Sequence, residues 1–127
     1  MNLLLDSNAF LWLLFAPGSI GDGARLAIES ATEVRVSVVT LWELTLKASK
    51  GKLPHHPDEL VRGVEALGAR ELAIEHRHLL MLPGIELPHG DPFDALLIAQ
   101  AHADDLVLLT ADRVLLASDD TTMNVRF

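Results

Sequence analysis

The chain has 127 residues, of which 50% are hydrophobic and none is cysteine, and its formal net charge is −8. This composition predicts one folded domain spanning residues 1–127 and argues against disorder, disulfides, thiolate zinc sites and a cysteine nucleophile. The negative charge argues against a broad basic surface for nucleic acid. It is compatible with an enzyme whose carboxylates bind divalent cations, because each cation offsets part of the charge.

Nothing in the sequence indicates secretion or a membrane association. The N-terminus lacks a basic segment followed by a cleavable apolar stretch, and the longest apolar run, residues 9–16, is too short to cross a bilayer. Together with the absence of cysteine, these features favour a cytoplasmic location.

Short apolar runs alternate with helical periodicity along the whole chain. The first half predicts a strand at 2–5, helices at 8–15 and 21–31, a strand at 34–38, and helices at 40–50 and 57–67. The second half predicts a short strand at 70–74, a helix at 75–82, a loop at 85–90, a helix from Asp91, a strand at 106–110 and an edge strand near Val125. This alternation predicts an α/β domain with a small, mostly parallel sheet flanked by helices.

Helix starts are marked by polar residues. Ser7 or Asn8 is expected to cap the helix at 8–15, and Thr40 the helix at 40–50, with Glu43 at its third position. Asp91 is expected to cap the next acidic helix, because Pro92 suits its first position and Asp94 its first turn.

Four carboxylates are placed where a shared site can form. Asp6 and Asp112 follow two apolar strands, and Glu43 and Asp94 lie near helix starts. In parallel sheets, ligands bind beyond the carboxyl ends of the strands, so these acids can share one rim. For Asp94 this depends on the loop at 85–90, because its helix precedes a strand.

Each acid also has an ordinary structural explanation. Asp91 and Asp94 suit a well-made helix start, Glu43 can pair with Lys47 at i, i+4, and Asp112 can form an Asx-turn. If the four acids do converge, their mutual repulsion requires a cation, and oxygen ligands favour Mg²⁺ or Mn²⁺. Metal-assisted phosphodiester hydrolysis is the matching chemistry.

Four blocks of sequence carry a resemblance to a known family. They are Leu4-Leu5-Asp6-Ser7-Asn8-Ala9-Phe10-Leu11-Trp12, residues 37–53 with Leu41-Trp42-Glu43-Leu44, Asp91-Pro92-Phe93-Asp94 running into Leu97-Ile98-Ala99-Gln100-Ala101, and Leu109-Thr110-Ala111-Asp112-Arg113. In this order and spacing they resemble the PIN domain, and within it the VapC-like ribonuclease toxins of prokaryotic toxin–antitoxin pairs.

The resemblance implies a PIN-like fold and a Mg²⁺- or Mn²⁺-dependent endoribonuclease. It assigns the metal-binding and catalytic roles to Asp6, Glu43, Asp94 and Asp112, with Asp91 as an accessory acid. In this interpretation Asp6, Asp94 and Asp112 bind the ion and Glu43 binds or orients the attacking water. The implied partners are RNA, a cognate antitoxin and a second copy of the chain.

Several further residues belong to this hypothesis. Ser7 can bond Asp6 or a water in the site, or cap the following helix; Asn8 is similar; Thr110 can support Asp112 or simply end a strand. Ser7 stands where relatives often have Thr, and Ala95 where they usually have Arg, so the strength or choice of substrate is in question.

Other polar and aromatic groups have competing explanations. Lys47, Lys50 and Lys52 can attract RNA phosphate, although cations at a helix end are favoured by its dipole anyway. The pairs His55-His56 and His76-x-His78 lack matching zinc ligands and are expected in polar loop or helix-start settings. Residues 12–15 favour buried packing over a dimer or antitoxin contact.

Two alternatives to a nuclease come from different classes. A non-catalytic binding module would keep the fold only to hold a partner, but the complete acidic set argues against it. A Mg²⁺-dependent phosphatase or phosphoacceptor domain would need a second acid near Asp6 and a lysine beyond a later strand, and no lysine follows Lys52.

Overall fold

A single parallel sheet organises the chain, and the computed structural model describes residues 1–127. The strands are β1 (Asn2–Leu5), β2 (Glu33–Ser37), β3 (Arg70–Leu72), β4 (Val107–Thr110) and β5 (Thr122–Asn124). Their order is β3-β2-β1-β4-β5, and every neighbouring pair is parallel. The predicted α/β class is therefore confirmed, and the order places β1 at the centre.

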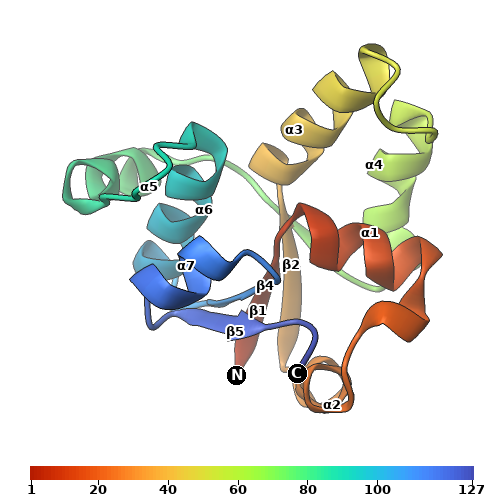
Figure 1. Ribbon diagram of the computed structural model, residues 1–127, viewed down its shortest axis with the longest axis horizontal. Coiled ribbons are helices and arrows are strands. Elements are labelled where there is room, and N and C mark those ends of the chain that lie inside the picture. The colour runs from red at the N-terminus through yellow and green to blue at the C-terminus, as the bar shows by residue number, and fades with distance from the viewer.

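Helices cover both faces of this sheet (Figure 1). They are α1 (Ser7–Phe15), α2 (Asp22–Ser30), α3 (Val38–Ser49), α4 (Pro57–Ala66), α5 (His76–Met81), α6 (Pro92–Ala103) and α7 (Arg113–Ser118), with short 3-10 turns η1 (Pro17–Ser19) and η2 (Leu82–Gly84). Figure 1 shows α5, α6 and α7 on one side of the sheet and α1, α2 and α4 on the other. No helix is both long and apolar enough to cross a membrane.

Alternation along the central strand divides the core into two clusters. Leu3 and Leu5 pack with Phe10 of α1 and other residues of one cluster, whereas Leu4 packs with Ile98 of α6 in the other. All three leucines are completely buried. Successive strand residues point to opposite faces, so a wholly apolar β1 is what a sheet covered on both sides requires.

The carboxyl edge of the sheet is where most helices begin. Helices α1, α3 and α7 start immediately after β1, β2 and β4, near the carboxyl ends of those strands. Helix α6 also begins there, because a helix that connects parallel strands runs back from the carboxyl edge to the amino edge. The location of Asp94 therefore follows from the crossover itself.

Two of the predicted helix starts are wrong, and one helix was not predicted. Asp6 caps α1 by accepting a hydrogen bond from the Ala9 amide at 2.8 Å, in place of Ser7 or Asn8. Ser37 caps α3 in place of Thr40, so α3 begins earlier and Glu43 lies in its second turn. Helix α7 was not predicted; its cap is Asp112, so the turn at this residue opens a helix.

The remaining differences are small. The predicted strand near Val125 is β5, which ends one residue earlier at Asn124 and is an edge strand. Residues 12–14 are partly buried against the core, as predicted, whereas Phe15 is exposed and its ring stacks on His55.

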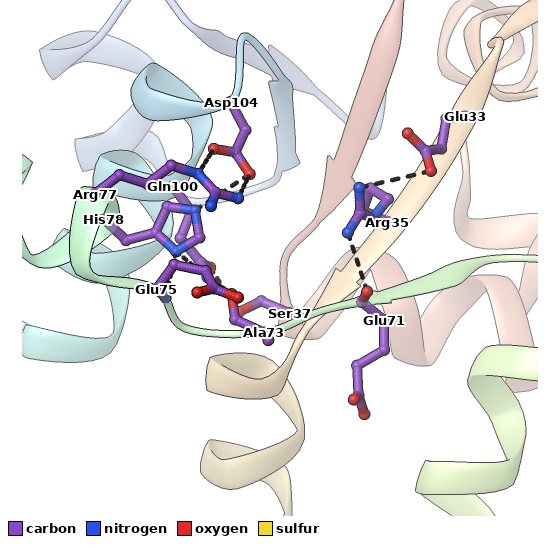
Figure 2. A network of polar contacts seen from close by, with 10 residues as sticks. All are labelled: Glu33, Arg35, Ser37, Glu71, Ala73, Glu75, Arg77, His78, Gln100 and Asp104. Carbon is purple, nitrogen blue, oxygen red and sulfur yellow. Dashed lines mark hydrogen bonds and ion pairs between the residues drawn. The ribbon is translucent and has the colours of Figure 1, made fainter.

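A buried polar network fixes the start of α3 against α6 (Figure 2). The Ser37 hydroxyl donates to Gln100 Oε1 at 2.5 Å, and the Gln100 amide donates to the Ala73 carbonyl at 3.3 Å. His78, which is completely buried in α5, accepts at Nδ1 from the Glu75 amide and lies beside Gln100. Buried hydrogen bonds such as that from Ser37 to Gln100 rigidify a core, so this one holds two helices that carry acidic residues in a fixed relation.

Candidate active site at the carboxyl edge of the sheet

A polar hollow of about 210 Å³ opens at the carboxyl edge, and no hydrophobic residue lines it. Its lining residues are Asp6, Ser7, Asn8, Glu43, Lys47, Asp91, Asp94 and Asp112. All four predicted metal-binding acids, the predicted accessory acid, Ser7 and Asn8 are thus brought together from α1, α3, α6, α7 and their caps. Thr110, the remaining predicted site residue, is completely buried next to the hollow.

Asp6 is the most buried acid of the hollow, with 6% of its surface exposed. Burial raises the pKa of its carboxyl, the charges of Glu43 and Asp112 add to this effect, and the pKa is about 6. The hydrogen bonds from the Ala9 amide and the Thr110 side chain lower the pKa, but they do not offset the burial. Asp6 therefore holds a proton far more readily than an exposed aspartate does.

Glu43 is held in place from two sides. The Ser7 hydroxyl donates a hydrogen bond to its Oε1 atom. Its Oε2 atom lies 3.7 Å from Lys47 Nζ, the i, i+4 pair that the sequence predicts. Ser7 neither bonds Asp6 nor caps α1, so these two predicted roles are wrong, and its contact with a water in the site stays a prediction. The contact with Glu43 joins the start of α1 to the second turn of α3.

Asp91 and Asp94 share the first turn of α6. Asp91 is the predicted cap, and its Oδ1 accepts from the Phe93 and Asp94 amides at 2.9 and 3.3 Å. Burial raises the pKa of Asp94, repulsion by Asp91, Asp112 and Glu43 adds to this effect, and the pKa is about 7. The helix start satisfies Asp91 and leaves the Asp94 carboxylate directed into the hollow.

Asp112 caps a helix and also contributes its carboxylate to the hollow. Its Oδ1 caps α7 by accepting from the Val114 and Leu115 amides at 2.8 and 3.2 Å. The Thr110 hydroxyl accepts from the Asp112 amide at 3.0 Å, which is the supporting contact predicted for Thr110. One carboxylate oxygen is therefore engaged with backbone while the side chain remains partly exposed at the hollow.

His89 lies beside the hollow, although the sequence analysis gave it no role in the site. Its Nε2 atom lies 3.3 Å from Asp94 Oδ2 and 3.9 Å from Asp112 Oδ2. The other ring nitrogen, Nδ1, accepts from the Asp91 amide at 3.1 Å, so Nε2 carries the proton. His89 thus donates toward the acids. The feature of the sequence that could have indicated this contact is the position of His89 two residues before Asp91, the cap of α6.

The donor set fits a hard divalent cation. The hollow gathers carboxylate oxygens, and the pKa values of two of its acids are raised mainly by burial and further by neighbouring negative charge. His89, Asp94 and Asp112 offer ligand-type atoms within 4.8 Å of one another. A cation would remove the repulsion that raises these pKa values, and oxygen donors select Mg²⁺ or Mn²⁺.

The two histidine pairs outside the hollow have structural surroundings. His56 caps α4, and His55 stacks on Phe15 with the ring centroids 3.8 Å apart. His78 lies in the first turn of α5, a helix-start setting as predicted, but it is completely buried and lies 3.2 Å from Asp104. Its α5 position faces the network of Figure 2, away from solvent.

Comparison with known proteins gives a family and a fold. The PIN domain family model matches residues 3–119. A toxin–antitoxin complex from Klebsiella pneumoniae is similar in structure, with a TM-score of 0.64, 21% identity, and 96% of each chain covered. VapBC2 from Rickettsia felis bound to a promoter DNA fragment has a TM-score of 0.64, 16% identity, and covers 97% of this chain and 96% of its own. A search of curated proteins finds no match.

Proposed function

Because this chain belongs to the PIN domain family, we propose that it is a metal-dependent endoribonuclease that hydrolyses RNA phosphodiester bonds. The observation that carries the proposal is the hollow in which Asp6, Glu43, Asp94 and Asp112 converge without an apolar residue. Two of these acids have pKa values near neutrality in the absence of a cation. A structural cluster would be expected to pair such charges with lysine or arginine.

The side chains divide the work at this site. Asp6, Asp94 and Asp112 would hold Mg²⁺ or Mn²⁺, which supplies positive charge beside the scissile phosphate and lowers the pKa of the attacking water. Glu43, fixed by Ser7 and Lys47, would accept a proton from that water or orient it. Asp91 keeps the start of α6 in place, and Thr110 does the same for Asp112.

We also propose that the protein is the toxin of a toxin–antitoxin pair. One structural neighbour is a toxin–antitoxin complex and the other is VapBC2, and this likeness supports an antitoxin as the partner. A homodimer, which rests on the resemblance in the sequence, and a cytoplasmic location, which rests on the absence of cysteine and of a secretion signal, complete this proposal.

The first experiment is cleavage of a mixed panel of end-labelled RNAs by purified protein with Mn²⁺. We expect cleavage that EDTA abolishes and that Asp6→Asn abolishes. Asparagine can still accept the hydrogen bond from the Ala9 amide, so the cap of α1 and the fold are retained. Circular dichroism of the variant checks the fold.

Asp22→Asn is the matched control, because Asp22 is an acid in the first turn of α2, outside the hollow. This control should cut like the parent protein. Full activity of Asp6→Asn would overturn the assignment of the site. Absence of cleavage together with absence of Mn²⁺ binding would instead support a binding module.

A further inference from the structure

All three lysines of this acidic chain lie around one groove. Lys47, Lys50 and Lys52 are the only lysines in the sequence, and the formal net charge is −8. They line a groove of about 360 Å³ together with Glu43, Leu46, Asp91, Pro92 and Phe93. This groove adjoins the acidic hollow, with which it shares Glu43, Lys47 and Asp91.

The end of α3 brings the lysines together. Lys50 is the C-cap, and Gly51 follows with a φ of +71°, a left-handed conformation that glycine adopts without strain. The Lys52 amide then donates to the Lys47 carbonyl at 2.9 Å, which is the reversal of a Schellman turn. The turn therefore returns the chain so that Lys52 lies beside Lys47 instead of a further turn along the helix.

The lysines are available for a ligand, unlike most arginines. Lys50 and Lys52 are exposed and form no ion pair, and Lys47 contacts only Glu43. By contrast, Arg35, Arg62, Arg70 and Arg77 are all paired with carboxylates. The dipole of α3 favours cations at its end, but it accounts neither for Lys52, which lies beyond the helix, nor for the groove.

An apolar hollow continues the groove on its other side. It measures about 180 Å³ and is lined by Trp42, Leu82, Pro92, Phe93 and Leu96, so it shares Pro92 and Phe93 with the lysine groove. Trp42 is 52% exposed and contacts Phe93 edge to face, with the ring centroids 4.8 Å apart. An exposed tryptophan next to free cations is the combination with which proteins bind unpaired nucleotides, through stacking and phosphate contacts.

We propose that the lysine groove binds phosphates next to the scissile bond of a single-stranded RNA, and that Trp42 and Phe93 receive a neighbouring unpaired base. This proposal rests on the proposed nuclease function. The acidic hollow, the lysine groove and the apolar hollow then form one continuous path for RNA. The acids would bind the ion, the lysines the phosphates, and the aromatic rings a base. A base that is paired in a duplex cannot enter the apolar hollow, so the path selects unpaired RNA.

The test measures binding separately from cleavage. Labelled single-stranded RNA is titrated against the Asp6→Asn protein, and against the same protein carrying Lys50→Gln and Lys52→Gln. We expect these two changes to weaken binding on the order of tenfold at low salt. The slope of log affinity against log salt should become shallower by about 1.4, because each single-strand phosphate contact contributes about 0.7.

Arg25→Gln with Arg126→Gln is the matched control. These residues belong to α2 and the C-terminal segment, which lie together at the end of the molecule away from α3 in Figure 1. The control removes the same amount of charge and should leave both the affinity and the salt slope unchanged. Equal losses in the two double variants would overturn the groove and indicate general attraction by net charge.

Trp42 provides a second readout. The chain has two tryptophans, so quenching of fluorescence by single-stranded RNA should disappear in Trp42→Phe while Trp12 still emits. Duplex RNA should quench little. Unchanged RNA binding in the lysine variant, or tight binding of an acidic peptide in preference to RNA, would overturn the proposal even if wild-type protein cuts RNA. Cleavage of RNA by the Asp6→Asn protein would instead overturn the assignment of the nuclease site.

Discussion

The two ends of α6 hold aspartates in opposite ways. Asp94, in the first turn, lies among other acids, and burial with their repulsion raises its pKa to about 7. Asp104, the C-cap, accepts two hydrogen bonds from Arg77 at 2.7 and 2.9 Å and lies 3.2 Å from His78. Its pKa falls to about 2, chiefly through the bond to Arg77 (Figure 2).

The difference separates an acid that is paired within the protein from an acid that lacks a cationic partner. Asp104 is complete within the protein, because Arg77 supplies both the positive charge and two hydrogen bonds. Asp94 has only His89 to oppose three neighbouring carboxylates, although an arginine at position 95 would be an obvious partner. The residue at that position is alanine. In the proposed function a bound cation supplies the charge that opposes the Asp94 carboxylate.

The same substitution at the two ends should give the largest contrast. Asp94→Asn is expected to lower RNA cleavage by at least about a hundredfold, because a metal ligand contributes several kcal/mol to the transition state. Asp104→Asn should retain cleavage within about tenfold of the parent, because it lies outside the hollow. Initial rates on one labelled RNA with Mn²⁺ measure both.

Metal binding can be followed in the same pair without any substrate. Mn²⁺ at a hundred times its Kd stabilises a folded protein by about 2.7 kcal/mol, so the thermal midpoint of wild-type and Asp104→Asn should rise by several degrees. Asp94→Asn should show no such rise. An equal rise in all three proteins would mean that the ion binds elsewhere.

The stability of the metal-free protein should depend on pH with opposite signs at the two ends. The folded pKa of Asp94 is above its ordinary value of 3.8, so its contribution is full below about pH 4 and is lost as pH rises through 7. The folded pKa of Asp104 is below that value, so its contribution is present above about pH 4 and is lost toward pH 2.

Urea unfolding between pH 2 and pH 8 measures both contributions. Asp94→Asn should remove part of the fall in stability between pH 4 and 7, and the rest belongs to Asp6, whose pKa is also raised. Asp104→Asn should remove part of the fall below pH 4, and it should cost about 1–3 kcal/mol at neutral pH because completely buried His78 loses its partner. Identical profiles for the two variants would contradict the contrast between the ends of α6.

The sequence predicted the sheet and the composition of the hollow because both depend on local patterns. Apolar runs such as residues 2–5 indicate strands buried on both faces, and acids that follow such runs must lie at the carboxyl edge. The metal-binding role of these acids stays a prediction until an ion is measured. What the pattern could not supply was the partner of each side chain.

The helix caps show that contacts between residues distant in the sequence can decide where a helix begins. Thr40 with Glu43 has the spacing of a capping box, yet the helix begins at Val38 because the Ser37 hydroxyl accepts from the Val39 amide at 3.0 Å and is fixed by Gln100. Ser37 and Gln100 are 63 residues apart in the chain. The six-residue α7 is too short to show a periodic pattern. The lysine groove depends on one turn at Gly51 and on α6 packing beside α3.

Replacing His89 should give the smallest of the expected effects, and it tests what sets the pKa of Asp94 at the start of α6. His89 is the one group that lowers the pKa of Asp94, and it does so by directing Nε2 toward that carboxylate. His89→Ala should therefore raise the pKa of Asp94 above 7, so that protons compete more strongly with the ion. We expect Mn²⁺ affinity to fall by less than about tenfold at pH 6.5, corresponding to a shift of under one pKa unit, and to match the parent at pH 8.5.

The direction of this effect distinguishes two roles of the imidazole. If Nε2 were itself a ligand, the loss of affinity in His89→Ala would persist at pH 8.5, where Asp94 is ionised in both proteins. If the imidazole only donates to Asp94, the loss disappears there, and His89→Gln, which keeps a donor, restores part of the affinity at pH 6.5. Exposed His76→Ala serves as the control that should change nothing. Nδ1 accepts from the Asp91 amide, so the proton is on Nε2. The geometry therefore favours the role of His89 as a hydrogen-bond donor to Asp94 over a role as a metal ligand.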